Sequence, residues 1–256
     1  MKNNLWKDNI FSNLIIDMNK HLRNFISVIL VAVMAFSGYK IVTTLLDYKK
    51  ASDTYTELRE NYSPEAEEGL MEDDLKNINP DYRLWLFVEN TNINYPVVSY
   101  GNNDYYLYRD FLGQDSKSGT LFMDYRNNFE EDESSVIYGH NMKNKTMFNN
   151  LELFKENDFW NKDSLIHIYR GDYEYIYEPF SVFVAKPEFD YVKVDFDGEN
   201  DFNEYMNQVK ASSTYWDKDA APKYKDKILT LSTCSYEFDD ARTVLEAKLI
   251  DKIPVE

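Results

Sequence analysis

Cysteine and histidine are scarce in this chain: it contains one cysteine, Cys234, and three histidines among 256 residues. A single thiol cannot form a disulfide within the chain, and a structural zinc site usually needs four Cys or His ligands. The sequence therefore argues against stabilisation by disulfides or by structural zinc. A lone cysteine is commonly a small buried hydrophobic residue, so Cys234 needs further evidence before it is given a chemical role.

A basic surplus is also lacking, because 28 Lys and Arg stand against 45 Asp and Glu, for a net charge of −17. Residues 1–50 carry seven Lys or Arg against three Asp, so the remainder carries −21. Such a chain has no cationic surplus with which to bind nucleic acid by counterion release. Its 16 Phe, 21 Tyr and 43% hydrophobic residues can build a core, and the aromatic share favours β-structure.

One long, mainly apolar run, residues 25–46, stands out near the N-terminus, and Lys40 is its only charged residue. As a helix it would span about 33 Å, enough for the hydrocarbon core of a bilayer. A cleaved signal peptide is the alternative, since Ala35 and Ser37 are small enough for a cleavage site. The apolar residues that continue to Leu46 favour an uncleaved anchor. Four basic residues precede the run and two follow it, which predicts a cytoplasmic segment 1–24 and an external domain.

The rest of the chain predicts a helical segment and then a mainly β domain. Residues 47–80 are expected to be helical, with Ser63 as an N-cap, Pro64 at the first helical position and Pro80 as the end. The domain at 81–256 contains apolar runs typical of short strands. These strands are expected at 84–88, 93–97, 120–123, 135–138, 164–169, 173–185, 227–233 and 243–250. With short helices at 146–159 and 198–213, the pattern predicts a β-barrel or a β-sandwich.

Three chemically active side chains follow or begin these strands. Cys234 comes directly after the strand that ends at Thr233, and Arg242 precedes the last strand, so a β-hairpin would bring them within about 5 Å. His140 follows another strand, just after Gly139. A cation beside a thiol stabilises the reactive thiolate, an imidazole can protonate a leaving amine, and an arginine can bind a developing oxyanion.

The residues alone leave other interpretations of these three side chains open. His140 could be a loop histidine that bonds to the backbone, and Arg242 could pair with Asp239 or Asp240. Composition and spacing therefore suggest nucleophilic catalysis without deciding for it.

The motifs around these residues resemble those of the sortase family. Leu229-Thr230-Leu231-Ser232-Thr233-Cys234, followed by Arg242, resembles the TLxTC…R signature, and Tyr138-Gly139-His140 resembles the histidine motif of the family. Gly119-Thr120-Leu121-Phe122-Met123-Asp124 is similar to a further sortase segment. The stretch from Tyr191 to Trp216, which includes a helix before the cysteine-bearing strand, resembles class B, as does Tyr95-Pro96-Val97-Val98.

The resemblance implies a mainly β fold, an eight-stranded sortase barrel with N-terminal helices and an inserted helix. It implies a cysteine transpeptidase in which Cys234 forms a thioester after the Thr of a C-terminal sorting motif. A peptidoglycan amine would then accept the protein, with His140 as acid and base and Arg242 on the oxyanion. The implied partners are secreted proteins with that motif, a peptidoglycan precursor or cross-bridge, and the membrane. No metal or organic cofactor is implied. Substrate contacts are expected from Asn103, Leu107, Tyr138, Tyr191, Val192 and Ser232.

One residue departs from the class B pattern, and three other functions stay open. Class B members often carry an acidic residue directly after the cysteine, whereas Ser235 stands there in this chain. Glu237 is a candidate for that acidic role. A cysteine protease would use water as acceptor, a pilin-polymerising sortase would use a lysine, and a binding module would keep the groove without catalysis. The inserted helix favours cell-wall anchoring over pilin polymerisation.

Overall fold

The computed structural model describes residues 20–66, 69–70, 72–186, 188–235 and 237–255. The chain divides into two compact units, Met1–Asp47 and Tyr48–Glu256. Helix α2, Lys20–Tyr62, contributes to both. The expected cytoplasmic segment 1–24 lies, up to residue 19, outside the described residues.

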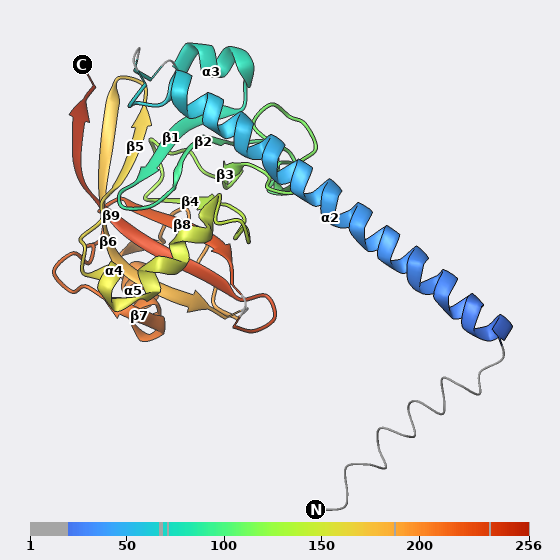
Figure 1. Ribbon diagram of the computed structural model, residues 1–256. Coiled ribbons are helices and arrows are strands. Elements are labelled where there is room, and N and C mark those ends of the chain that lie inside the picture. Colours follow the sequence, from blue (N-terminus) through green and yellow to red (C-terminus); the bar gives the residue numbers. More distant parts are fainter. Residues whose placement is uncertain (1–19, 67–68, 71, 187, 236, 256) are drawn as a thin grey trace, which may run out of the picture. The chain divides into compact units, whose positions relative to one another are not determined.

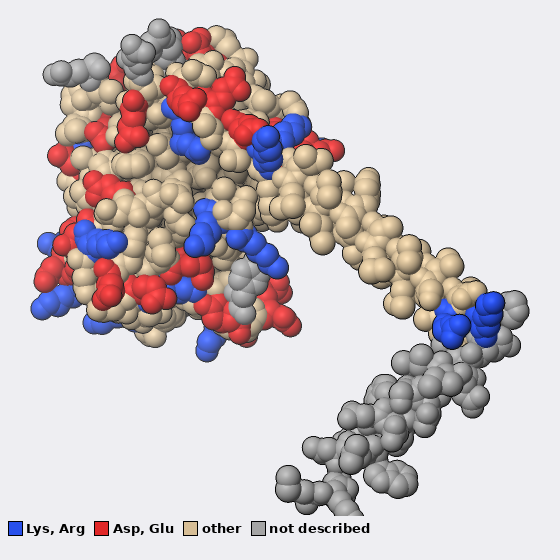
Figure 2. Space-filling model, viewed as in Figure 1, with Lys and Arg blue, Asp and Glu red and all other residues tan. Residues whose placement is uncertain are grey.

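The described part of the first unit is the N-terminal part of α2. The helix from Leu22 onward is long and apolar enough to cross a membrane by length and composition, with a mean hydropathy of 2.1 over its most apolar 18 residues. None of that window is buried within the protein, and Phe25 and Val28 are more than 60% exposed. The surface of this part of the helix is largely uncharged in Figure 2. Exposed apolar surface on this scale marks a membrane or partner contact, so α2 is a candidate membrane anchor.

The second unit is built on a closed sheet of eight strands. Their order is β5-β1-β2-β3-β4-β8-β9-β6, and β6 pairs back with β5. A ninth strand, β7, adds to the outer edge of β6 (Figure 1). The strands are β1 Tyr82–Val88, β2 Asn94–Val98, β3 Leu121–Met123, β4 Ser134–Tyr138, β5 Ile166–Arg170, β6 Tyr173–Ala185, β7 Ser213–Trp216, β8 Ile228–Cys234 and β9 Arg242–Pro254.

Short helices connect these strands. They are α3 Glu72–Ile78, the 3₁₀ helices η1 Tyr105–Tyr108 and η2 Phe148–Lys155, α4 Asn157–Trp160 and α5 Gly198–Ser212. In Figure 1, α3 lies at one end of the barrel, whereas α4, α5 and β7 lie towards the other. The expected eight-stranded barrel with N-terminal helices and a helix before the cysteine-bearing strand is therefore confirmed.

Side chains that alternate along β8 and β9 supply two separate hydrophobic clusters. Leu229 and Leu231 point into the barrel, where they join Trp85 and Leu245. Ile228 belongs to a second cluster with Val244, which packs against Phe202 and Val209 of α5. Both faces of these two strands are thus covered, which makes the end of β8 a rigid place for a functional side chain.

Two predictions about local structure were wrong, and one strand was missed. Helix α2 ends at Tyr62, and residues 63–66 form a turn, so Ser63 does not cap a new helix. The ring of Pro64 disfavours the helical conformation at the residue before it, which explains why the chain leaves the helix there. Residues 146–159 form η2 and α4 in place of one continuous helix. Strand β7 was not predicted, because the helical pattern at 198–213 runs directly into it.

Candidate active site

Three strand ends meet at one edge of the barrel and define the site. Strand β4 pairs in parallel with β8, with Tyr138 opposite Ser232, so both strands end at the same edge. Strand β9 pairs antiparallel with β8 and begins there, with Arg242 opposite Cys234. The residues that follow β4, end β8 and begin β9 are His140, Cys234 and Arg242, so the topology brings all three together.

Cys234 and Arg242 are in direct contact. The guanidinium Nη1 of Arg242 donates to Sγ of Cys234 over 2.8 Å, and both residues are half-buried. A guanidinium stays charged at every physiological pH and carries five donors. It can therefore stabilise a thiolate and still offer other N–H groups to a substrate oxygen in the same cavity.

His140 is fixed to the end of β8 through the residues on either side of it in the chain, Gly139 and Asn141. The amide of Gly139 donates to the carbonyl of Ser232 at 3.2 Å, and the hydroxyl of Thr233 donates to the carbonyl of Gly139 at 2.7 Å. On the other side, Nδ2 of Asn141 donates to the carbonyl of Cys234 at 2.9 Å. Both neighbours of His140 are thus tied to the last three residues of β8.

The imidazole of His140 is oriented by a backbone carbonyl. Its Nε2 lies 2.7 Å from the carbonyl oxygen of Leu107 on η1. Because a carbonyl can only accept, Nε2 carries the hydrogen, and the neutral ring keeps Nδ1 as its acceptor. The exposed ring of Tyr108 lies beside the imidazole, with 6.0 Å between ring centroids.

A cavity of about 250 Å³ joins the three groups to most of the expected substrate contacts. Its lining includes Asn103, Leu107, Tyr138 and Ser232 together with Cys234, His140 and Arg242. Tyr191 and Val192 are not in the lining. Tyr191 is 9% exposed and reaches the site through its hydroxyl, which lies 2.8 Å from Oγ of Ser232. Val192 is half-buried and packs on the second hydrophobic cluster.

Asp124, which follows β3, organises one wall of this cavity. Its carboxylate accepts hydrogen bonds from Asn103 and Tyr138, each at 2.9 Å, and from Arg126 at 2.8 Å. Burial would raise the pKa of Asp124, but these donors outweigh it and lower the pKa to about 2. The carboxylate is therefore charged at neutral pH and holds two predicted contact residues in place.

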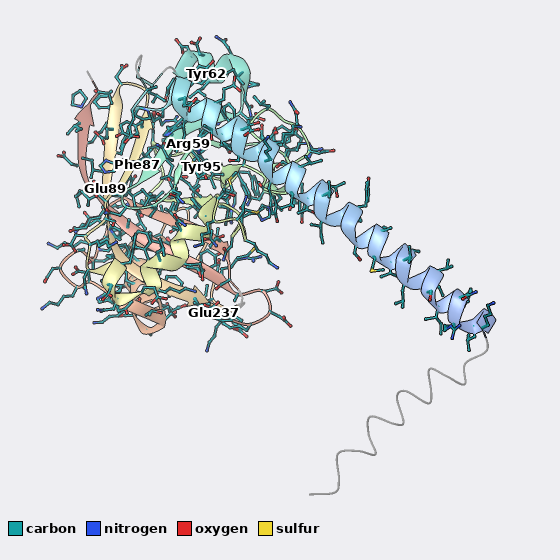
Figure 3. All side chains as sticks on the ribbon, viewed as in Figure 1. Arg59, Tyr62, Phe87, Glu89, Tyr95 and Glu237 are labelled. Carbon is teal, nitrogen blue, oxygen red and sulfur yellow. The ribbon has the colours of Figure 1, made fainter. Side chains whose placement is uncertain are left out.

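The loop between β8 and β9 carries its own charged cluster. Ser235, directly after the cysteine, bonds through its hydroxyl to Glu237. Glu237, labelled in Figure 3, also pairs at 2.5 Å with Lys155 of η2, which bonds Glu152 at 2.8 Å. Burial would raise the pKa of Glu237, but Lys155 and Ser235 lower it to about 2. An acidic side chain thus lies three residues beyond Cys234.

Several residues of the site were not singled out from the sequence. Asp104 and Phe122 line the cavity, while Thr233, Asn141 and Asp124 hold its walls. Phe122, Asp124 and Thr233 lie within the quoted motifs, which was the available signal, whereas Asp104 and Asn141 lie outside them. Among the residues that the structure describes, no three His, Cys, Asp or Glu side chains are grouped to hold a metal ion.

Comparison with known proteins identifies the family. A family model described as the sortase domain matches residues 86–250. Sortase B of Listeria monocytogenes is 33% identical over 239 residues, which cover 89% of this chain and 96% of that protein. An X-ray structure of Clostridium perfringens sortase B is 40% identical, with a TM-score of 0.67, and covers 71% of this chain and 100% of its own. A Staphylococcus aureus sortase B–substrate complex is 27% identical, with a TM-score of 0.66 and coverages of 84% and 98%. The chain therefore belongs to the sortase family, matches its class B, and is a sortase-type cysteine transpeptidase.

Proposed function

We propose that this enzyme cleaves a C-terminal sorting motif of secreted proteins after its Thr and transfers them to an amine of peptidoglycan. The observation that carries the proposal is the contact of 2.8 Å between Arg242 and Sγ of Cys234, in a cavity that His140 also lines. A half-buried thiol beside a fixed guanidinium and an oriented imidazole is the arrangement that thiolate chemistry on a carbonyl requires.

The first half-reaction forms a thioester on Cys234. Nδ1 of His140 takes the proton of the Cys234 thiol, and the resulting thiolate attacks the carbonyl carbon of the Thr. The charge that develops on the carbonyl oxygen is stabilised by the remaining N–H groups of Arg242. The bond between the Thr carbonyl and the next residue's nitrogen then breaks, and His140 protonates the departing amine. Since Nε2 is bonded to Leu107, Nδ1 is the nitrogen that exchanges the proton.

The second half-reaction moves the acyl group to an amine. The amine nitrogen attacks the thioester carbonyl, His140 takes the proton that the nitrogen loses, and Cys234 leaves as thiolate. The product is a new amide, and the enzyme returns to its starting state. The carboxylates of Glu237 and Glu152 share one cation, Lys155, and so leave a net negative charge beside the β8–β9 loop that would attract a molecule carrying an amino group.

The location of this reaction follows from the anchor. We assign residues 25–46 of α2 as a single membrane span, with residues 1–24 in the cytoplasm and the catalytic domain at 81–256 outside the cell. The linker at 47–80 contains the end of α2, the turn after Tyr62 and α3. An external domain has access both to secreted proteins and to the cell wall. The apolar window of α2, none of which is buried within the protein, supports this assignment.

The proposal is tested by supplying the full chain, in detergent micelles, with fluorogenic peptides of the form X-Pro-X-Thr-X and an acceptor amine. Triglycine and a diaminopimelate-containing peptide represent two kinds of peptidoglycan amine. Mass spectrometry then separates the transfer product from the hydrolysis product. We expect the transfer product to dominate with at least one amine and to rise with the amine concentration.

The controls distinguish the competing functions. Cys234→Ala should abolish both products, whereas Ser235→Ala leaves the thiol in place and should retain cleavage. Hydrolysis that no amine can divert would instead identify a cysteine protease. Equal inactivity of the wild type and Cys234→Ala with every peptide would contradict catalysis and would favour a binding module.

A further inference from the structure

Helix α2 is linked to the surroundings of His140 through one buried hydroxyl, that of Tyr55. Tyr55, on the part of α2 that belongs to the barrel unit, is 2% exposed. Its hydroxyl donates to the carbonyl of Gly119 at 2.8 Å and lies 3.1 Å from Oγ1 of Thr120. Burial raises the pKa of Tyr55, so the hydroxyl keeps its hydrogen at physiological pH. Two consecutive residues just before β3 are thereby fixed to the helix.

Gly119 and Thr120 in turn hold η1, which carries the carbonyl that orients His140. Gly119 has a φ of +59°, and a side chain built there would lie 2.7 Å from the carbonyl oxygen of Leu107. The hydroxyl of Thr120 donates to the carbonyl of Arg109 at 2.7 Å, and the amide of Thr120 donates to the carbonyl of Tyr106 at 3.2 Å. The pair thus packs against the carbonyl of Leu107 and bonds the carbonyls on both sides of it.

The ring of Tyr55 also supports the segment that follows His140, indirectly, through Tyr95 of β2. It packs edge-on against Tyr95, with 5.4 Å between ring centroids. The hydroxyl of Tyr95 accepts from the amide of Met147 at 3.3 Å, and Met147 forms a β-bridge with Asn141. Figure 3 labels Tyr95 and Arg59 where the last turns of α2 meet the barrel. One side chain therefore supports the backbone both at Leu107 and beyond His140.

We propose that Tyr55 is a positioning residue for His140: it fixes the Leu107 carbonyl against Nε2 and so keeps Nδ1 free for proton transfer. The inference rests on the proposed role of His140 in catalysis. Tyr55 touches no reacting atom, and its effect passes through Gly119, Thr120 and η1. Loss of its hydroxyl should release η1 and let the imidazole change tautomer and orientation.

The test compares Tyr55→Phe with Tyr82→Phe in the full chain in detergent micelles. Tyr82 is a matched control, because it is 1% exposed and its hydroxyl has no hydrogen-bond partner among the described residues. The first readout is the ¹⁵N NMR spectrum of histidine side chains at about pH 9, where imidazoles are neutral. His167, held at 2.6 Å by Glu174, serves as an internal reference. The second readout is kcat and KM for peptide cleavage.

We expect Tyr55→Phe to move the His140 resonances away from the pure Nε2–H tautomer and to lower kcat about five- to tenfold with KM unchanged. Tyr82→Phe should change neither readout. Gly119→Ala, which must displace the Leu107 carbonyl, should shift the same resonances. Unchanged His140 resonances in a folded Tyr55→Phe protein, or equal losses of kcat in both Tyr→Phe variants, would overturn the proposal. If the wild type acylates no peptide, the proposed function fails, while the nitrogen resonances still decide this inference.

Discussion

Replacement of the buried Glu246 by Gln is predicted to stabilise this enzyme at neutral pH. Glu246 lies on β9 and is 0% exposed, in the layer between the barrel and α5. The hydroxyl of Tyr205 on α5 donates to its Oε1, but its Oε2 has no partner among the described residues. Burial raises the pKa of Glu246 from 4.5 to about 8, and the bond from Tyr205 opposes this rise only in part.

The sign and size of the effect follow from this raised pKa. Below pH 4.5 the carboxyl is protonated in both the folded and the unfolded state, so it does not affect the pH dependence of stability. Between pH 4.5 and about 8 the unfolded chain loses the proton while the folded chain keeps it, which lowers the free energy of unfolding by about 1.4 kcal/mol per pH unit. At pH 7 the accumulated cost is about 3 kcal/mol. A glutamine resembles the protonated acid and can still accept from Tyr205, so it removes that cost.

Urea unfolding of the full chain in detergent micelles, followed by tryptophan fluorescence, measures the difference. We expect Glu246→Gln to exceed the wild type by about 3 kcal/mol at pH 7 and to match it near pH 4.5. Glu204→Gln, an exposed neighbour of Tyr205 on α5, is the control for the change in net charge and should show no such pH dependence. An equal or lower stability of Glu246→Gln at pH 7 would refute the reasoning, because it would mean that the folded protein uses an ionised Glu246.

Three further predictions concern the walls and the chemistry of the site. Asp124→Asn should lower the free energy of unfolding by about 2 kcal/mol at pH 7, because the depressed pKa of Asp124, about 2, stabilises the folded protein above pH 4. This stability is lost as the pH falls towards 2, so the free energies of the variant and the wild type from urea unfolding should become equal there. A difference that persists at low pH would contradict this prediction. Arg242→Lys should lower kcat at least ~100-fold with a much smaller change in KM. The reason is that an ammonium lacks the planar fork of donors with which a guanidinium can bond both Cys234 and an oxyanion. A kcat within tenfold of the wild type would exclude oxyanion binding by Arg242. A double-mutant cycle of Tyr191→Phe and Ser232→Ala should give a coupling of about 1 kcal/mol in unfolding, and additive losses would show that their contact is not stabilising.

The pattern of apolar residues predicted most of the strands, because these residues alternate or cluster where the strands lie. The range 173–185 is β6 to the residue, and the hairpin that places Cys234 opposite Arg242 formed as expected. Strand β7 and η1 were missed, since four-residue elements have too few positions to show a period. The turn after Tyr62 was misassigned, because Ser-Pro-Glu is a helix-start pattern that also suits a turn.

The site was less accessible to sequence reasoning, since hydrogen bonds between distant segments determine it. Leu107 was expected to contact substrate, and the structure adds that its backbone carbonyl orients His140. The support that Tyr55 gives to Gly119 joins positions 64 residues apart. Every residue has a backbone carbonyl, so the sequence does not show which carbonyl accepts a hydrogen bond from a distant residue. Such contacts can be identified only from the folded structure.

The most direct test of the account is the intact mass of the enzyme, quenched in acid during turnover with a cleavable peptide. The account predicts an adduct that equals the peptide up to its Thr, located on Cys234 by peptide mapping and discharged when an acceptor amine is added before the quench. Peptide cleavage with no adduct on Cys234 under single-turnover conditions, or undiminished cleavage by Cys234→Ala, would contradict the account.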